Sequence, residues 1–280
     1  MENQLHTSLS ASLPIKHDLK IATALTIIVA ILMTAASVGG LLFPDSIYPT
    51  DELRHAYLAN DAVNLLVGLP ILLSSMWLAR RGKLIGLLCW PGAFLYTFYN
   101  YIAYVVGMPI SLMTLVFVSL VLLSAYPMME LLNVIDRDVL KERLAGVVYE
   151  KISGGVLVLF GVAFFFLVAG VITGANADQG TIPLTEVGVA IADIILSVLL
   201  SAGGVLLFLC KSLGYASGLG LLFAASALFI GVILVVVLQP ALSDAPFVFE
   251  DIIALAGMGL ICFIPTGLFT RGVITREKSR

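Results

Sequence analysis

The sequence predicts an all-α polytopic membrane protein, a bundle of eight transmembrane helices arranged as two parallel repeats of four. Three observations lead to this fold class. The 280 residues are 60% hydrophobic and only 12% charged, whereas a soluble domain is roughly half apolar and about a quarter charged. The apolar residues form long uninterrupted runs, and the basic residues gather in alternate connections between these runs.

Eight apolar runs are each long enough to cross a hydrocarbon layer of about 30 Å as a helix. They cover residues 21–43, 58–79, 84–107, 110–130, 153–175, 187–210, 216–239 and 250–270. The first run exceeds the usual length of a secretory signal, so we expect it to be a retained span. The predicted organisation is a cytoplasmic segment (1–20), a first membrane repeat (21–130), a linker (131–152), a second membrane repeat (153–271) and a cytoplasmic tail (272–280).

The lysines and arginines predict the orientation of the chain. With eight spans, all of the 15 basic residues except Arg54 lie on one side of the membrane. Loops rich in lysine and arginine stay in the cytoplasm. We therefore expect a multi-pass protein of a prokaryotic inner (plasma) membrane, with both termini cytoplasmic.

The linker predicts a short amphipathic helix. Leu140, Leu144, Val147 and Val148 recur at helical spacing, and charged residues fill the opposite face. This pattern is typical of a helix that lies on a membrane surface. Here it would join the two repeats.

The repeat itself is predicted from matching landmarks in the two halves. When Asp61 is placed on Asp193, an offset of 132, a basic stop and a glycine-rich turn follow in both halves, and the later prolines also correspond. Each half has an even number of spans, so both enter the membrane from the same side. The repeat is therefore parallel, with a pseudo-two-fold axis along the membrane normal.

Asp61 is the first candidate functional residue, because an ionisable group inside an apolar span is costly and commonly marks a site. Tyr57, Asp61, Asn64 and Gly68 are spaced 4, 3 and 4 apart and share one helix face. Thr50 is a predicted N-cap, which would place Asp61 well inside the helix. The sequence is equally compatible with an alternative in which Asn60 or Asp61 itself caps a shorter helix at the water line.

Asp193 is the second candidate, at the equivalent depth of the sixth span, with Ser197 one turn further on and Thr185 as the predicted N-cap. The third span offers polar partners near its outer end, namely Thr97, Asn100, Tyr101 and Tyr104. Tyr104 is interpreted as part of an aromatic belt at the membrane boundary. The predicted ligand- or ion-binding set is Asp61, Asn64, Asn100, Tyr101 and Asp193.

Prolines and glycines predict where helices bend and touch. Pro70 should kink the second span and free a backbone carbonyl. The pairs Gly170-x-x-x-Gly174 and Gly214-x-x-x-Gly218 predict close helix contacts.

Several chemistries are not indicated. The three histidines lie outside the spans, and the three cysteines show no metal-binding or disulfide spacing. No phosphate-binding glycine loop or hydrolase motif occurs, and no basic cluster favours nucleic acid. We therefore expect no metal and no cofactor, and no catalytic residues are assigned.

The run Asn60-Asp61-x6-Gly68-Leu69-Pro70, followed by Leu78-Ala79-Arg80-Arg81-Gly82, Trp90-Pro91-Gly92 and Tyr99-Asn100-Tyr101, resembles a family of prokaryotic polytopic integral membrane proteins with no assigned activity. The resemblance covers most of the chain. It implies a prokaryotic source and carries no functional residues.

Three functions fit these features, and a transporter or channel is favoured. In that function Asp61 and Asp193 bind a proton or cation, while Asn64, Asn100 and Tyr101 order a small solute or ion. A lipid-modifying membrane enzyme would use Asp61 as a base and Tyr101 as a proton donor. A non-catalytic assembly subunit would need none of these groups. The expected partner is the lipid bilayer, and a homo-oligomer is compatible with the sequence.

Overall fold

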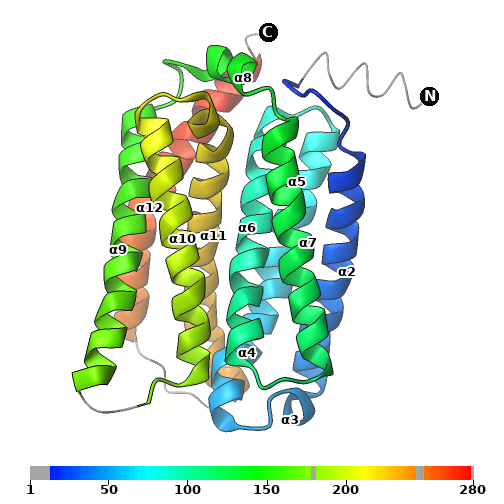
Figure 1. The fold of residues 1–280 in the computed structure, drawn as a ribbon, viewed down its shortest axis with the longest axis vertical. Coiled ribbons are helices and arrows are strands. Elements are labelled where there is room, and N and C mark those ends of the chain that lie inside the picture. Colours follow the sequence, from blue (N-terminus) through cyan, green and yellow to red (C-terminus); the bar gives the residue numbers. More distant parts are fainter. Residues whose placement is uncertain (1–12, 178–180, 244–246, 248, 279–280) are drawn as a thin grey trace.

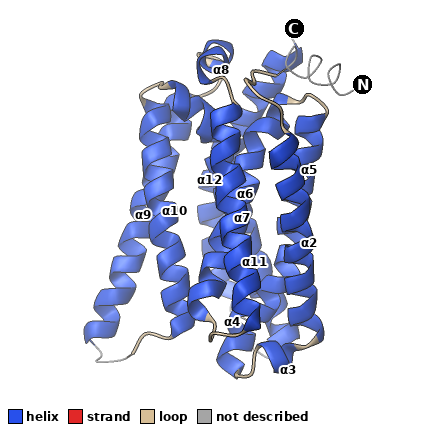
Figure 2. Ribbon diagram, turned by 45° about the vertical axis from the view of Figure 1, so that its right-hand side comes forward, coloured by secondary structure: helices blue, strands red, loops and turns tan. Residues whose placement is uncertain are grey.

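The computed structural model describes residues 13–177, 181–243, 247 and 249–278, and helices make up nearly all of this part of the chain (Figures 1 and 2). The all-α prediction is confirmed. The elements are α2 (Lys20–Leu42), α3 (Pro44–Ile47), α4 (Asp51–Val63), a π-helix η1 (Asn64–Gly68), α5 (Leu69–Arg80), α6 (Leu84–Gly107), α7 (Leu112–Val134), α8 (Arg137–Leu144), α9 (Glu150–Ala177), α10 (Leu184–Phe208), α11 (Ser212–Ser243) and α12 (Phe249–Lys278). The outer parts of the predicted terminal segments, residues 1–12 and 279–280, lie outside the described residues.

Seven helices in the described part are long and apolar enough to cross a membrane: α2, α4–α5 with η1, α7, α9, α10, α11 and α12. Large apolar side chains cover the outside of the bundle. Ile31, Leu115 and Phe166 are 62, 67 and 66% exposed. An apolar surface of this extent is stable against lipid rather than water. The chain is therefore a multi-pass membrane protein.

The remaining predicted span forms α6, which is not among the seven. Trp90, Thr97, Asn100 and several tyrosines lower its hydropathy. Nearly all of its side chains are buried, because α5, α7, α10 and α11 pack around it (Figure 1). The helix lies at the centre of the bundle, where protein rather than lipid satisfies its polar groups.

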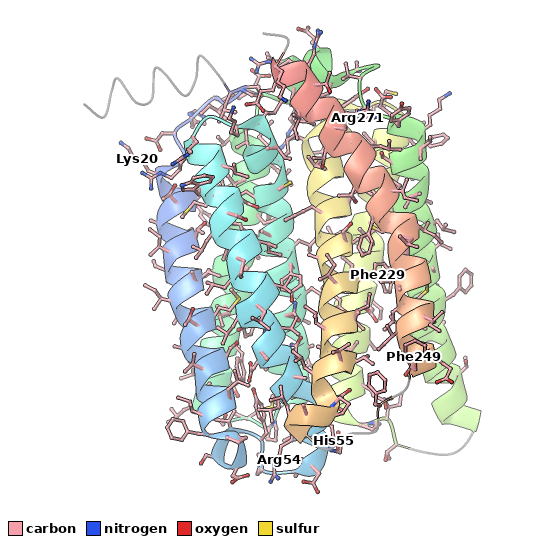
Figure 3. All side chains as sticks on the ribbon, turned by 180° about the vertical axis from the view of Figure 1, so that it is seen from behind. Lys20, Arg54, His55, Phe229, Phe249 and Arg271 are labelled. Atoms are coloured by element: carbon pink, nitrogen blue, oxygen red, sulfur yellow. The ribbon has the colours of Figure 1, made fainter. Side chains whose placement is uncertain are left out.

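Labelled side chains mark the two ends of the bundle. Lys20 and Arg271 lie at one end, and Arg54 and His55 lie at the other (Figure 3). A salt bridge of 3.4 Å between Lys83 Nζ and Glu277 Oε1 joins α12 to the connection before α6 at the first end. Which end faces the cytoplasm stays a prediction.

The linker contains the eight-residue helix α8, packed against the ends of α11 and α12. Leu140 and Leu144 are fully buried, and Val148 is 3% exposed. Protein therefore covers this apolar face, and the expectation that the helix lies with this face on the membrane surface is wrong. The sequence pattern predicted an amphipathic helix that continues through Val148, but α8 ends at Leu144, and Val147 and Val148 lie beyond it.

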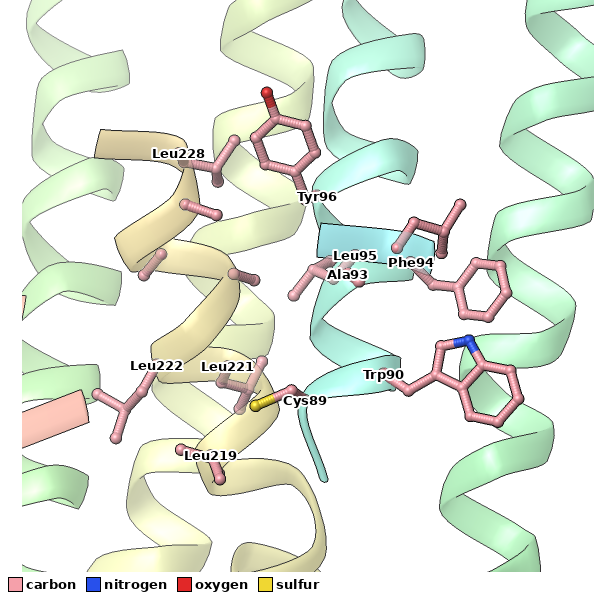
Figure 4. Packing of buried hydrophobic residues seen from close by; sticks show 14 of the residues in the cluster. Cys89, Trp90, Ala93, Phe94, Leu95, Tyr96, Leu219, Leu221, Leu222 and Leu228 are labelled. Carbon is pink, nitrogen blue, oxygen red and sulfur yellow. The ribbon is translucent and has the colours of Figure 1, made fainter. Parts of the chain in front are cut away.

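The centre of the fold is the contact between α6 and α11. Cys89 of α6 and Leu221 of α11 lie close together at this contact, whereas Trp90 and Phe94 point to the opposite side of α6 (Figure 4). A β-carbon at Gly92 would overlap the carbonyl oxygen of Gly220, so the two backbones touch at this point. Small residues permit such a close approach of membrane helices.

Of the two glycine pairs predicted to make close helix contacts, one is confirmed and the other is wrong. A β-carbon at Gly214 would meet the backbone of Leu207, and one at Gly218 would lie 2.8 Å from the Leu207 side chain, so the second pair packs as expected. Gly170 and Gly174 have no neighbour within 4 Å of such an atom. The predicted contact of this pair is wrong, because that side of α9 faces outward.

Trp90→Phe should destabilise the protein by about 1–3 kcal/mol. The indole Nε1–H of Trp90 donates to Thr26 Oγ1 at 3.0 Å, and the side chain is fully buried. The matched control is Trp77→Phe, because Trp77 is 49% exposed and should lose no more than about 0.5 kcal/mol. Denaturant unfolding in detergent compares the two variants, and equal losses would contradict the packing described.

Candidate functional site

Asp61 is a buried carboxyl group held by two phenols. It lies on α4 and is 1% exposed. Tyr48 Oη donates to Asp61 Oδ2 at 2.5 Å, and Tyr104 Oη donates to Asp61 Oδ1 at 3.0 Å. None of the salt bridges between described residues involves Asp61. The carboxyl group therefore has hydrogen-bond donors but no counter-charge in a region of low dielectric.

Tyr48 comes from the short connection between α2 and α4. The helix α3 turns the chain back, and Arg54 Nε donates to the carbonyl oxygen of Tyr48 at 3.1 Å. Burial, followed by the charge of Asp61, raises the pKa of the Tyr48 phenol well above its ordinary value. The phenol therefore stays protonated and acts as a donor to Asp61.

The start of α4 fixes the depth of Asp61. Thr50 is the N-cap, and its Oγ1 accepts a hydrogen bond from Leu53 N at 3.3 Å, as predicted. Asp61 therefore lies in the third turn of the helix. The alternative in which Asn60 or Asp61 caps the helix is wrong.

The predicted N-cap of α10 is also wrong. This helix begins at Leu184 after Pro183, so Thr185 lies inside the first turn. Its Oγ1 instead donates to Glu52 Oε1 on α4 at 2.8 Å. The carboxylate of another helix is a strong acceptor that a local capping rule does not anticipate.

Helix α2 leaves room for the Asp61 side chain, and its register decides which of its residues face the site. A β-carbon at Gly40 would overlap Asp61 Oδ2 and would lie 2.8 Å from Tyr48 Oη. Further along, a β-carbon at Gly68 would lie 3.5 Å from Met33 Sδ. Because α2 runs antiparallel to the α4–η1–α5 segment, these two contacts place Ser37 of α2 opposite Asn64.

Beside Asp61 lies a group of buried polar atoms without protein partners. They are Ser37 Oγ, both amide atoms of Asn64 and Tyr101 Oη. The Ser37 side chain lies next to both the Asp61 carboxyl group and the Tyr101 hydroxyl group. Each unsatisfied buried group costs about 1–3 kcal/mol, so this cluster is suited to bind water or a small polar species. Asp61, Asn64 and Tyr101 thus lie together in one cluster.

The π-helix η1 positions Asn64 in this cluster. The Leu69 N–H bonds the carbonyl oxygen of Asn64, five residues earlier, instead of the usual four. The next residue is Pro70, which has no N–H to continue an α-helical pattern. The sequence predicted a local disturbance here, and the structure shows that it is a π-helical turn, a feature frequent at functional sites.

Tyr104 connects Asp61 to a further amide. Asn60 Nδ2 donates to Tyr104 Oη at 3.2 Å, and the Tyr57 ring packs on the Tyr104 ring with centroids 4.4 Å apart. The Tyr104 hydroxyl also lies 3.3 Å from the Tyr57 carbonyl oxygen. Tyr104 is fully buried, so its interpretation as an aromatic-belt residue is wrong. The belt rule assumes a lipid-facing helix, and α6 has almost no such face.

Asp193 occupies a separate position. It lies on α10, is 5% exposed, and accepts a hydrogen bond from Tyr99 Oη at 2.8 Å. It borders a cavity of about 390 Å³ between α4, α9 and α10. Ser197, one turn away, donates to the Gly161 carbonyl oxygen at 2.6 Å. Asp61 and Asp193 thus share no hydrogen-bond partner in the described structure, although α6 supplies a tyrosine to each.

Asn100 faces another space and does not bond to Asp61. Its Nδ2 donates to the Tyr96 carbonyl oxygen at 2.9 Å. It lines a cavity of about 180 Å³ between α4, α6, α10 and α11. The five predicted residues therefore fall into three places: the Asp61 cluster, the Asn100 cavity and the Asp193 position.

Sequence reasoning did not assign Ser37, Tyr48, Asn60, Tyr99 and Tyr104 to the site. Two of these had a usable signal, since Asn60 directly precedes Asp61 and Tyr104 follows Tyr101 by one turn. Tyr48 had none, because it reaches Asp61 only through the fold of the α3 connection.

Comparison of the chain with protein-family models, with curated proteins and with solved structures finds no match. Within the described residues, no group of three or more His, Cys, Asp or Glu could hold a metal ion. The geometry of the site is therefore the basis for assigning a function.

Proposed function

We propose that this protein is a proton-dependent membrane transport protein in which Asp61 carries an exchangeable proton. The observation that carries the proposal is the 1% exposure of Asp61 together with the two phenolic donors and the lack of a basic partner among described residues. A buried carboxylate without a counter-charge is neutralised by binding a proton or a cation. Intramembrane acids of this kind commonly lie on ion or substrate paths.

The neighbouring groups favour a proton over a metal cation. The Asn64 amide nitrogen, Ser37 Oγ and Tyr101 Oη are all without protein partners. Water can satisfy each of them, because it both donates and accepts hydrogen bonds, and it can also pass a proton to Asp61. A metal cation would attract the oxygens but repel the amide N–H groups.

We further propose the eight-span, two-repeat architecture, with α6 as the eighth span. Arg81 and Leu209, 128 residues apart, both have φ −83° and ψ 8° where they end α5 and α10. Gly92 and Gly220 have the same separation and touch each other, as residues near a pseudo-two-fold axis do. Because η1 adds one residue to the first half, this register pairs Asp193 with Asn64 rather than with Asp61.

The proposed orientation places both termini in the cytoplasm of a prokaryotic cell. The basic residues support it, because Lys20 and Arg271 share one end of the bundle while Arg54 lies at the other (Figure 3). Asp61, ten residues after the start of α4 near Arg54, would then be in the outer part of the membrane.

Asp61→Asn should reduce proton flux to the level of protein-free vesicles. Purified protein is reconstituted into liposomes with a trapped pH-sensitive dye, and a potassium diffusion potential drives protons. The control is Asp45→Asn, since the Asp45 side chain is 87% exposed and should leave the flux unchanged.

Three results would contradict the proposal. Wild-type vesicles could acidify no faster than protein-free vesicles, or Asp61→Asn could match the wild type. Alternatively, Asp61-dependent flux could require a sodium gradient and be independent of the proton gradient, which would assign the site to a cation. A tightly co-purifying protein with no flux would favour the assembly-subunit alternative. Turnover of a lipid that depends on Asp61 would favour an enzyme.

A further inference from the structure

We propose that the cavity between α4, α6, α10 and α11 is a binding site for a small uncharged solute that carries an amide or a similar N–H donor group. This inference rests on the proposed transport function, for which it names the class of solute. The cavity is separate from the Asp61 cluster and lies between elements of the first and second halves of the chain. Substrate sites of transporters with internal repeats commonly lie at such interfaces.

The size of the cavity limits the solute. Its volume is about 180 Å³. A water molecule in the liquid occupies about 30 Å³, so the space corresponds to roughly six waters. A solute of about four to eight non-hydrogen atoms fits this volume, with its remaining surface against protein.

The lining excludes a charged solute. Tyrosine rings, alanines, valines, a leucine and a glycine form most of the wall, and its polar side chains are uncharged. An ion in such a site would lose its hydration without gaining an opposite charge. A neutral solute with a short apolar part fits the aromatic and aliphatic walls.

The polar groups of the lining favour an N–H donor. Asn100 Nδ2 donates one N–H to the Tyr96 carbonyl oxygen, which leaves its second N–H and the acceptor Asn100 Oδ1. Asn60 Nδ2 likewise donates one N–H to Tyr104 Oη, which leaves its second N–H and Asn60 Oδ1. The Tyr99 hydroxyl hydrogen is donated to Asp193. A primary amide matches such side chains, because it offers two N–H donors to the acceptors and a carbonyl acceptor to the remaining N–H groups.

The cavity is linked to Asp61 through two hydrogen bonds. Asn60 borders the cavity and donates to Tyr104 Oη, and Tyr104 donates to Asp61 Oδ1. A solute bound to Asn60 would therefore be connected through Tyr104 to the carboxyl group that holds the exchangeable proton. This geometry gives a direct physical route by which solute binding and protonation of Asp61 can affect each other.

Contacts between helices tie α4 to the second half at the Arg54 end of the bundle. Gln239 Nε2 on α11 donates to the His55 carbonyl oxygen at 2.7 Å, and Thr185 Oγ1 on α10 donates to Glu52 Oε1 at 2.8 Å. Both contacts lie nearer this end than the cavity-lining residues Ala56 and Asn60 of α4. These two hydrogen bonds therefore hold the helices around the cavity together on that side.

The test uses acetamide as the probe and acetate as its charged counterpart of equal size. Saturation-transfer NMR on the purified full-length protein in detergent detects the weak binding expected of so small a ligand. Acetamide should give a saturable signal with the wild type, and acetate should give none. Equal signals from both, or no signal from acetamide, would overturn the proposal.

Two variants locate the binding. Asn100→Leu removes an acceptor and should weaken acetamide binding about tenfold. Val235→Phe fills the cavity from α11 without touching the polar groups, and should abolish binding. The matched control is Asn133→Leu, an exposed position at the other end of the bundle, which should bind like the wild type. Unchanged binding in both cavity variants would overturn the site, and size-exclusion profiles establish that they are folded.

The acetamide-binding test and the proton-flux test can fail independently of each other. Cavity-dependent acetamide binding with no Asp61-dependent proton flux would uphold the site and reject proton coupling. Asp61-dependent proton flux without acetamide binding would reject the solute site alone.

Discussion

Replacing Gly92 by alanine should destabilise the bundle by about 3 kcal/mol or more, although alanine is ordinarily the better helix former. The new β-carbon would overlap the Gly220 carbonyl oxygen and would lie 2.8 Å from its carbonyl carbon and 2.9 Å from its Cα. These are backbone atoms of α11, so no side-chain rotation relieves the overlap. The helices α6 and α11 must separate, and the buried contacts of Figure 4 loosen with them.

The control for this prediction is Gly170→Ala. Gly170 is also helical, but no atom lies within 4 Å of an added β-carbon. This variant should be neutral or up to about 1 kcal/mol more stable, as helix propensity predicts. Unfolding in detergent, followed by tryptophan fluorescence, measures both. The contact between α6 and α11 would be refuted by equal stabilities of Gly92→Ala and Gly170→Ala.

Gly40→Ala should abolish the proton flux proposed for Asp61 while the protein remains folded. An added β-carbon would overlap Asp61 Oδ2 and would lie 2.8 Å from Tyr48 Oη. Asp61 can turn away, because its carboxyl group ends a flexible side chain, but it then loses the hydrogen bond from Tyr48. The carboxyl group would remain buried with an altered set of donors, which changes its proton affinity.

The adjacent residue provides a close control. An added β-carbon at Gly39 would lie 3.5 Å from Ile47 Cδ1, an ordinary van der Waals contact. Gly39→Ala should therefore retain wild-type flux in the liposome assay and wild-type stability. Flux lost equally in both variants would show that α2 itself tolerates no alanine there, and flux retained in Gly40→Ala would contradict the described packing around Asp61.

The helices could be predicted from the sequence because the features that produce them lie within each segment of the chain. Long apolar runs and basic residues at their ends reflect the bilayer directly, and each predicted run coincides with a helix or with the α4–η1–α5 segment. Asp61 could be singled out for the same reason, since a carboxyl group in such a run is exceptional. Thr50 fixed its depth through a capping rule that involves only neighbouring residues.

The partners of Asp61 could not be predicted in the same way, because they depend on tertiary packing. Tyr48 reaches the site through the α3 connection, and Ser37 through the antiparallel register of α2. Tyr104 was interpreted as a lipid-facing belt residue because the sequence does not show that four helices surround α6. Thr185 bonds to Glu52, 133 residues earlier in the chain.

The enclosure of α6 has a consequence for how the protein is made. This helix is synthesised before α10 and α11, yet these two later helices cover Asn100 and Gly92. The contacts that bury this polar and glycine-bearing face can form only after α10 and α11 have been synthesised. The burial of α6 is therefore completed late, once translation has passed α11.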